Sequence, residues 1–177
     1  MIAAFSTSGP LASVALLSDE GNVLFKGEEP AQGRAGEACL RLLGRGFEAT
    51  DTALAHVKLF AADLGPGSFT GVRVGIVLAK MLAWQQGAMC AGADAFDLVN
   101  PDEPVALPSR KGEWFLRIPG SDIDRTREEP THVGIPRASG FARLLARIAP
   151  VSPFELVPVY LLEPSISKPK TPYKEKP

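Results

Sequence analysis

The chain has 177 residues, of which 45% are hydrophobic and 22% are charged, and its formal net charge is −1. This composition excludes a disordered or fibrous chain and lacks the basic excess typical of proteins that bind nucleic acid alone. Cys39 and Cys90 lie far apart, and only His56 and His132 are available to join them, so neither a disulfide framework nor a zinc site is predicted. We therefore expect a globular protein of the reducing cytoplasm, without a metal site.

The first 18 residues lack charged side chains but do not predict a targeting segment. They have no basic start, and a turn at residues 6–10, Ser-Thr-Ser-Gly-Pro, interrupts the apolar pattern. We expect no targeting or membrane segment.

The N-terminal region predicts a meander of strands at residues 2–5, 12–17 and 23–25. A strand, turn and strand with hydroxyls and glycine in the turn is how actin-like and sugar-kinase-like folds hold phosphates, usually with an aspartate at the end of the first strand. Ser6 occupies that position here, and Thr7 follows it as a candidate anion contact.

Residues 34–47 have helical spacing, with Cys39 and Leu42 on an apolar side and Arg34 toward another side. Three glycines interrupt this segment, and each interior glycine costs up to about 1 kcal/mol relative to alanine. We therefore expect the helix to depend on tertiary or intermolecular packing. Its arginines are either simply solvated or face an acidic or phosphate-bearing partner.

The stretch at residues 63–75, Asp-Leu-Gly-Pro-Gly-Ser-Phe-Thr-Gly-Val-Arg-Val-Gly, follows an apolar run at 57–62 and predicts a strand, a tight loop and a helix. It is neither a Walker loop nor a dinucleotide fingerprint, because the required lysine and glycine spacing are missing. Two interpretations remain open. The stretch is either a strand-to-helix corner capped by Ser68 or Thr70, or an anion contact formed by Gly67, Ser68 and Thr70.

The predicted helix at residues 72–86 is apolar in most directions, and its two charged residues, Arg73 and Lys80, are seven apart and therefore lie on one face. Small residues at 71, 75, 79 and 83 recur every four positions and form a smooth stripe on which another element can lie close. The stripe packs either only inside the domain or also against a helix of another molecule.

The remaining predicted elements follow in chain order. They are a buried strand at 88–91 and a short helix at 93–99 after a parallel crossover, a strand pair at 104–107 and 114–118, a loop at 119–136, an amphipathic helix at 140–149 and a final segment at 156–162.

No catalytic constellation is indicated. Ser68 lies in Gly-Ser-Phe-Thr-Gly, which is not the pattern of a nucleophile elbow, and His56 and His132 lie in unremarkable surroundings. We therefore predict no catalytic residue in this chain.

The motif Gly65-Pro66-Gly67-Ser68-Phe69-Thr70-Gly71-Val72-Arg73-Val74-Gly75, followed by Ala79-Lys80, closely resembles the signature of the bacterial TsaB (YeaZ) family. That family supplies the accessory subunit of tRNA threonylcarbamoyladenosine biosynthesis. Further similarities lie in the N-terminal meander, in the turn at residues 110–113 and in the Pro-Val-Tyr-Leu of residues 158–161.

The resemblance implies an α/β, actin-like and ribonuclease H-like fold with a mixed sheet and helices. It implies a lobe at residues 1–100 and a C-terminal lobe at 101–164, which is shorter than in typical members. The composition of residues 165–177, rich in lysine and proline, predicts a disordered tail. The resemblance also implies that the helices at 34–47 and 72–86 pack against a partner, or against a second copy, as a four-helix bundle. The expected interface residues are Arg34, Cys39, Leu42, Val72, Gly75, Ile76, Ala79 and Ala83.

The chain departs from the family pattern at Ser6 and Ser109, where aspartates are expected, and at Gly36, where a histidine is usual. Hard cations need carboxylate or phosphate oxygens, so the missing aspartate argues against a magnesium-nucleotide site, and we expect no cofactor.

The function that the resemblance implies is that of a non-catalytic scaffold in the complex that modifies adenosine 37 of tRNAs reading ANN codons. Its expected partners are the catalytic paralogue TsaD and the ATPase TsaE, with a homodimer also possible and with tRNA bound only through the complex. The alternatives are an independent nucleotide-binding, kinase-like enzyme and a peptidase.

Overall fold

The computed structural model describes residues 1–161, so the predicted tail at 165–177 and the last residues of the second lobe lie outside the described residues. A five-stranded sheet forms the larger part of the chain, in the order β3-β2-β1-β4-β5. The strands β1, β2 and β3 are antiparallel neighbours, whereas β4 runs parallel to both β1 and β5. The five strands are β1 (Ile2–Ser6), β2 (Leu11–Leu17), β3 (Val23–Pro30), β4 (Leu59–Asp63) and β5 (Met89–Ala93).

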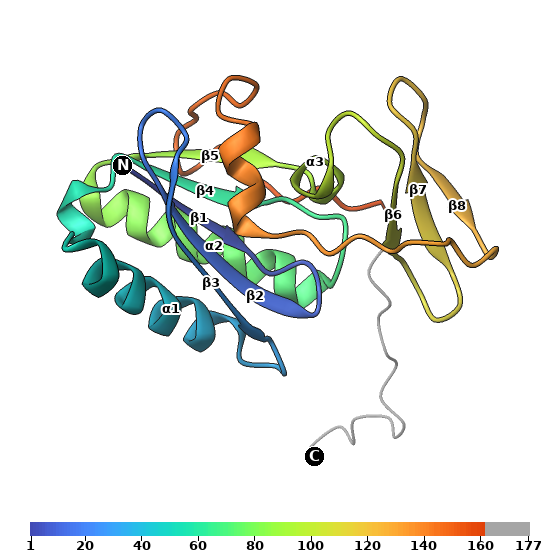
Figure 1. The fold of residues 1–177 in the computed structure, drawn as a ribbon, viewed down its shortest axis with the longest axis horizontal. Helices are drawn as coiled ribbons and strands as arrows, with labels where there is room; N and C mark the ends of the chain where they lie inside the picture. The colour runs from blue at the N-terminus through green and yellow to red at the C-terminus, as the bar shows by residue number, and fades with distance from the viewer. Residues whose placement is uncertain (162–177) are drawn as a thin grey trace, which may run out of the picture.

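Two long helices, α1 (Ala35–Thr50) and α2 (Phe69–Gln86), cover one face of this sheet, and the 3-10 helix η2 (Ala138–Arg143) covers the other (Figure 1). The short 3-10 helix η1 (Leu54–His56) leads from α1 into β4. On the α1 and α2 side the core contains Phe5, Phe60 and Leu42, all buried. On the η2 side, Phe141 and Leu144 pack on the sheet. Because both faces are covered, β1 and β4 are apolar along most of their length.

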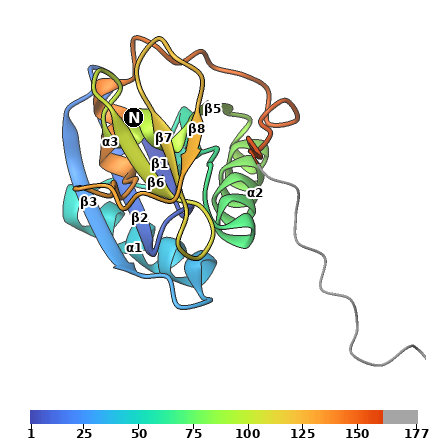
Figure 2. The same cartoon turned by 90° about the vertical axis from the view of Figure 1, so that its right-hand side faces the viewer.

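A second, three-stranded antiparallel sheet stands at one end of the first, as Figures 1 and 2 show. It has its own small core, which includes Phe96, Leu107 and Phe115. Its strands are β6 (Val105–Pro108), β7 (Trp114–Arg117) and β8 (Asp124–Thr126), and the helix α3 (Ala95–Val99) connects the two sheets. The predicted meander, crossover and strand pair are therefore confirmed.

Four segments differ from the sequence prediction. Strand β3 continues to Pro30 because it pairs with β2 along its length. Strand β8 lies within the expected loop, and its polar sequence carries no alternating apolar signal. The expected helix at 140–149 is instead η2 followed by turns: Phe141 and Leu144 are buried, but the Leu144 amide bonds to the carbonyl three residues back, at 2.9 Å. Helix α1 continues beyond the predicted end at residue 47, to Thr50.

Candidate functional site

The glycine-rich loop after β4 is a capped strand-to-helix corner. Gly65 has φ +86°, a conformation that favours glycine, and the hydroxyl of Ser68 accepts a hydrogen bond from the Gly71 amide at 3.2 Å. Ser68 is therefore the N-cap of α2, as the sequence predicted.

The turn between β1 and β2 lies directly on the start of α2. The Thr7 hydroxyl donates to the Gly71 carbonyl at 2.7 Å, and the Ser68 amide donates to the Ser8 carbonyl at 2.8 Å. A Cβ atom at Gly71 would lie 2.0 Å from the Thr7 carbonyl oxygen, and one at Gly67 would lie 2.4 Å from that of Ser8. The glycines of this motif are thus needed for close backbone packing, independently of any ligand.

A buried carboxylate, Asp63 at the end of β4, holds this corner together. Ser6 donates to Asp63 Oδ2 at 2.7 Å, Ser8 donates to the same oxygen, and the Gly65 amide donates to Oδ1 at 2.8 Å. Burial raises the pKa of Asp63 above its ordinary value, while the hydrogen bonds from Ser8, Gly65 and Ser6 act in the opposite direction. The sequence showed an acid next to the glycines, but nothing in it indicated that Ser6 and Ser8 would bond to that acid.

The predicted anion contacts separate into two groups. Gly67, Ser68 and Thr70 lie at the exposed start of α2, and an anion there stays a prediction. Thr7, in contrast, is buried and donates its hydroxyl to Gly71. The expectation of a ligand contact through Thr7 is therefore corrected, because its side chain points into the fold.

A cleft of about 540 Å³ lies between the two sheets. In the described part of the chain its lining comes from the β1–β2 turn, the glycine loop, the end of β6 and residues 134–136, and contains no charged side chain: Ser8, Gly9, Pro10, Pro66, Gly67, Ser68, Phe69, Leu107, Pro108, Ser109, Gly134 and Pro136. An actin-like fold implies a magnesium-bound nucleotide at such a place. These residues do not fit one, because no carboxylate is present for the metal and no cation for the phosphates.

The small-residue stripe of α2 faces its own sheet. Ala79 and Ala83 are completely buried, and a Cβ at Gly75 would lie 2.5 Å from the Thr7 hydroxyl oxygen. Of the expected interface residues only Arg34 is exposed, whereas seven are buried in the chain's own core: Cys39, Leu42, Val72, Gly75, Ile76, Ala79 and Ala83. The expected partner contact is therefore corrected for six of these residues, whereas for Ile76, which also lines a groove toward residues 156–160, it stays a prediction.

The opposite face of α2 is apolar and exposed. Met81 is 64% exposed, Trp84 is 72% exposed and Val77 is about half exposed, and Leu40 on the neighbouring helix α1 is also about half exposed. Two apolar grooves flank the helix: one of about 450 Å³ toward α1 and one of about 610 Å³ toward residues 156–160. Both grooves are lined by Val77 and Met81, so α2 forms a ridge between them. We call Leu40, Val77, Met81 and Trp84 the outer face.

The C-terminal segment forms the second wall of one groove. Arg73 stacks on the Phe69 ring, 3.9 Å from its centroid, and donates through Nε to the Tyr160 hydroxyl at 2.8 Å. Lys80 donates to the Leu156 carbonyl at 3.1 Å. Both cations of α2 therefore lie on one side, as predicted, and hold this segment against the helix.

Catalytic and metal-binding side chains do not gather in residues 1–161. No group of three or more His, Cys, Asp or Glu side chains converges there on a possible metal position. His56 and His132 are both exposed, and His56 Nδ1 accepts a hydrogen bond from the Ala53 amide. No helix in this part of the chain is long and apolar enough to cross a membrane.

The mixed sheet, its covering helices and the second small sheet define an α/β protein of the actin-like, TsaD-like class. Residues 29–94 match the family model of TsaD, tRNA N6-adenosine threonylcarbamoyltransferase. That match runs from the end of β3 through α1 and α2 to the residue after β5.

Within this class the chain is YeaZ-like in fold. It superposes on YeaZ from Pseudomonas aeruginosa with a TM-score of 0.75 at 21% identity, covering 90% of this chain and 99% of that one. A second structure, described as an uncharacterized protein from Pseudomonas aeruginosa with similarity to peptidase YEAZ, gives a TM-score of 0.76 at 20% identity, covering 91% and 99%. A comparison with curated proteins gave no match.

Proposed function

We propose that this chain is a divergent member of the TsaB (YeaZ) family and acts as a non-catalytic accessory subunit in threonylcarbamoyl modification of adenosine 37 in tRNAs that read ANN codons. Its main partner is a TsaD-type transferase, and TsaE and tRNA join through the assembled complex in the cytoplasm. The observation that carries the proposal is the outer face of α2, because contiguous exposed apolar surface of this kind marks a protein contact.

A docking surface is supported by the contrast between α2 and the cleft. The cleft offers no acid, base or cation to a substrate, whereas the grooves along α2 offer apolar pockets with Arg73 and Lys80 at their edges. The TsaD family model matches the segment that contains both α1 and α2. This contrast between an uncharged cleft and apolar grooves supports a subunit that binds a partner and does not itself catalyse a reaction.

The charges beside α2 favour a different protein over a second copy. Among residues 1–161, those that line the two grooves include Arg73 and Lys80 but no acidic side chain. A symmetric copy would bring the same cations to the same surface, whereas a partner with carboxylates would be complementary. We therefore propose the heteromer as the working state, with a homodimer as the alternative.

The test of docking is a binding titration between the purified chain and the TsaD-type transferase encoded in the same genome. Met81→Asp places a charge in both grooves and should weaken binding at least about tenfold, which corresponds to about 1.4 kcal/mol. The matched control is Ile118→Asp, which changes an exposed apolar residue beyond the end of β7. Equal affinities of the two variants would contradict docking through α2.

The test of the biological role is nucleoside mass spectrometry of tRNA from a deletion strain. We expect loss of threonylcarbamoyladenosine and its recovery when the parent gene, but not Met81→Asp, is returned. Normal modification in the deletion strain would contradict the proposal.

The two alternative functions have weaker support. A kinase-like enzyme would need charged groups where the cleft has none. A peptidase would need a nucleophile beside a base, and the cleft is lined by serines but by no histidine, cysteine or acid. Turnover of ATP or of a peptide that survives repurification would favour one of them.

A further inference from the structure

Helix α3 is shared between the two hydrophobic cores on either side of it. Phe96 packs in the core of the small sheet with Val105 and Phe115. Leu98, two residues later, packs with Phe141 in the core on the η2 side of the large sheet. At its start, the Ala95 amide donates to the Gly65 carbonyl at 2.7 Å, which joins α3 to the glycine-rich loop.

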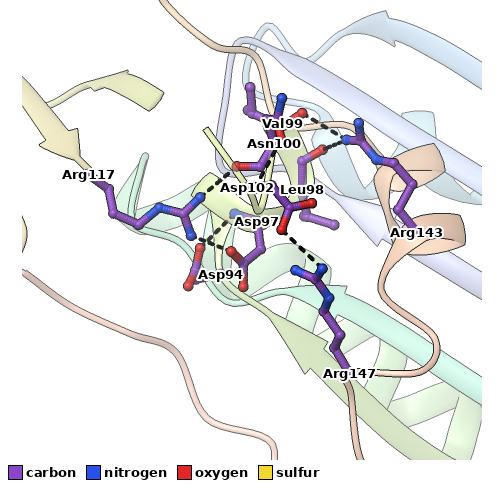
Figure 3. Close-up of polar contacts among 9 residues, drawn as sticks. All are labelled: Asp94, Asp97, Leu98, Val99, Asn100, Asp102, Arg117, Arg143 and Arg147. Carbon is purple, nitrogen blue, oxygen red and sulfur yellow. Dashed lines mark hydrogen bonds and ion pairs between the residues drawn. The ribbon is translucent and has the colours of Figure 1, made fainter. Parts of the chain in front are cut away.

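The C-terminal end of α3 is held by arginines that come from both sides, as Figure 3 shows. From β7, Arg117 pairs with Asp97 and donates through Nη2 to the Asn100 carbonyl at 2.6 Å. From the η2 side, Arg143 donates through Nη2 to the carbonyls of Leu98 and Val99, at 3.2 and 2.8 Å. Terminal carbonyls of a helix lack partners within the helix and attract cations, so both arginines satisfy groups that need a donor.

These contacts differ in how strongly water screens them. The Arg117 side chain is only 13% exposed and its guanidinium lies 5.5 Å from the centre of the Phe96 ring. A charged hydrogen-bonded pair in such surroundings fixes a geometry firmly. Arg147 also reaches this region and donates to Asp102 at 3.0 Å, but both side chains are more than half exposed, so this pair holds little.

We propose that α3, Arg117 and Arg143 form an interlobe lock, which keeps the small sheet in one orientation relative to the large sheet. Turning the small sheet away would pull Arg117 from Asp97 and Asn100, or else carry α3 along and pull Leu98 and Val99 from Arg143. The first movement would leave the Arg117 guanidinium, whose side chain is only 13% exposed, without its partners, and the second would break the hydrogen bonds of Arg143 to the carbonyls of Leu98 and Val99. The cleft between the sheets therefore keeps one width whether or not a molecule occupies it.

The lock is tested in the full chain by measuring the distance between two spin labels. One label is on α1, which packs on the large sheet, and the other is on the small sheet. The label sites are Ala49→Cys on α1 and Asp124→Cys on β8, both exposed. The native thiols are buried, and burial raises the pKa of Cys39 to about 12 and that of Cys90 to about 11, so they stay protonated and unreactive at neutral pH.

The parent should show one narrow distance distribution, unchanged when ATP and magnesium are added. Arg117→Gln, and independently Asp97→Asn, should broaden the distribution or add a second distance. Arg147→Gln is the matched control and should leave it narrow. A broad distribution in the parent, or a narrow one in both lock variants, would overturn the proposal. Loss of folding in both variants would also overturn it, because the pair would then stabilise the cores rather than their relative orientation.

Discussion

The two faces of α2 differ in their surroundings, because one packs inside the chain and the other is exposed. On the inner face, glycine and alanine let the helix backbone lie against the β1–β2 turn, and Ala79 and Ala83 are fully buried. On the outer face, larger side chains such as Met81 and Trp84 are exposed. Small residues allow close approach, and large exposed residues supply area for a contact. Changes on the inner face should therefore affect folding, and changes on the outer face should affect binding.

The largest effect is expected at Gly71, on the inner face. A methyl group there would meet the Thr7 carbonyl at 2.0 Å, and a backbone atom cannot move aside as a flexible side chain can. Gly71→Ala should lower the free energy of unfolding by more than about 3 kcal/mol, at the upper end of the range for overpacking. Urea unfolding measures this. A loss below about 1 kcal/mol would show that the β1–β2 turn can shift, and the contrast between the two faces would fail.

The next largest effect is expected at Asp63. Asp63→Ala leaves the Ser8 hydroxyl and the Gly65 amide without their buried acceptor, whereas the Ser6 hydroxyl keeps the Pro136 carbonyl at 3.1 Å. Even one buried donor without a partner costs about 1–3 kcal/mol, so the free energy of unfolding should fall by at least about 2 kcal/mol. Partner affinity per folded molecule should not change, because this carboxylate is inside the fold. An affinity loss at full folding would place Asp63 in the docking mechanism instead.

Asp63 also predicts a pH dependence of stability. Because burial raises the pKa of Asp63 in the folded chain, the folded state holds this proton more tightly than the unfolded state. Its contribution to stability is fully present below the unfolded pKa and is lost as pH rises through the raised folded pKa. Asp63→Asn removes this titration, so the free energy of unfolding of Asp63→Asn minus that of the parent should increase with pH in this window. A constant difference would show that the pKa is not raised.

A smaller effect, on binding alone, is expected at Trp84. Trp84→Ala should weaken binding to the TsaD-type partner about tenfold, because exposed aromatic residues are frequent anchors of protein interfaces. The free energy of unfolding should stay within about 0.5 kcal/mol of the parent, as is usual for surface substitutions. Ile118→Ala, on an exposed residue beyond β7, is the control. A stability loss without a binding loss would reverse the assignment of the two faces.

The sequence predicted the elements of α2 well but not the directions in which its faces point. The glycine-rich corner, the Ser68 cap and the spacing of Arg73 and Lys80 are local features, and local features follow from propensity and capping. Which face of α2 meets the sheet depends on the β1–β2 turn. Thr7 in that turn is 64 residues from Gly71 and contacts the helix backbone directly, which requires glycine at the contact. A stripe of small residues indicates close packing, but it does not say whether the neighbour is the same chain or another.

The buried partners of Asp63 and the interlobe contacts of Arg117 could not be predicted either, because the residues that meet are far apart in the sequence. Ser6 and Asp63 are 57 residues apart, and Arg117 and Asp97 are 20 apart, so no spacing rule joins them. Ser6 was read from the sequence only as a missing aspartate. In the structure the Ser6 hydroxyl donates to Asp63 on the neighbouring strand β4. Asp63 is inside the fold, and none of the described residues that line the cleft is charged.

The smallest effect is expected at Gly44 in α1, and it sharpens the comparison of inner and outer surfaces. A Cβ at Gly44 would meet nothing of residues 1–161 within 4 Å, so no contact in this part of the chain requires glycine there. Gly44→Ala should therefore raise the free energy of unfolding by about 0.5–1 kcal/mol, through the better helix propensity of alanine. Gly71 and Gly44 are thus matched helical glycines, one enclosed and one open, and their substitution by alanine should change the free energy of unfolding in opposite directions.

If the open glycine, Gly44, lets a partner helix approach α1 closely, the same substitution should weaken binding while it strengthens folding. Unfolding and binding measurements on this single variant distinguish a glycine retained for association from one that simply lies in solvent, and unchanged affinity would restrict the docking surface to the outer face.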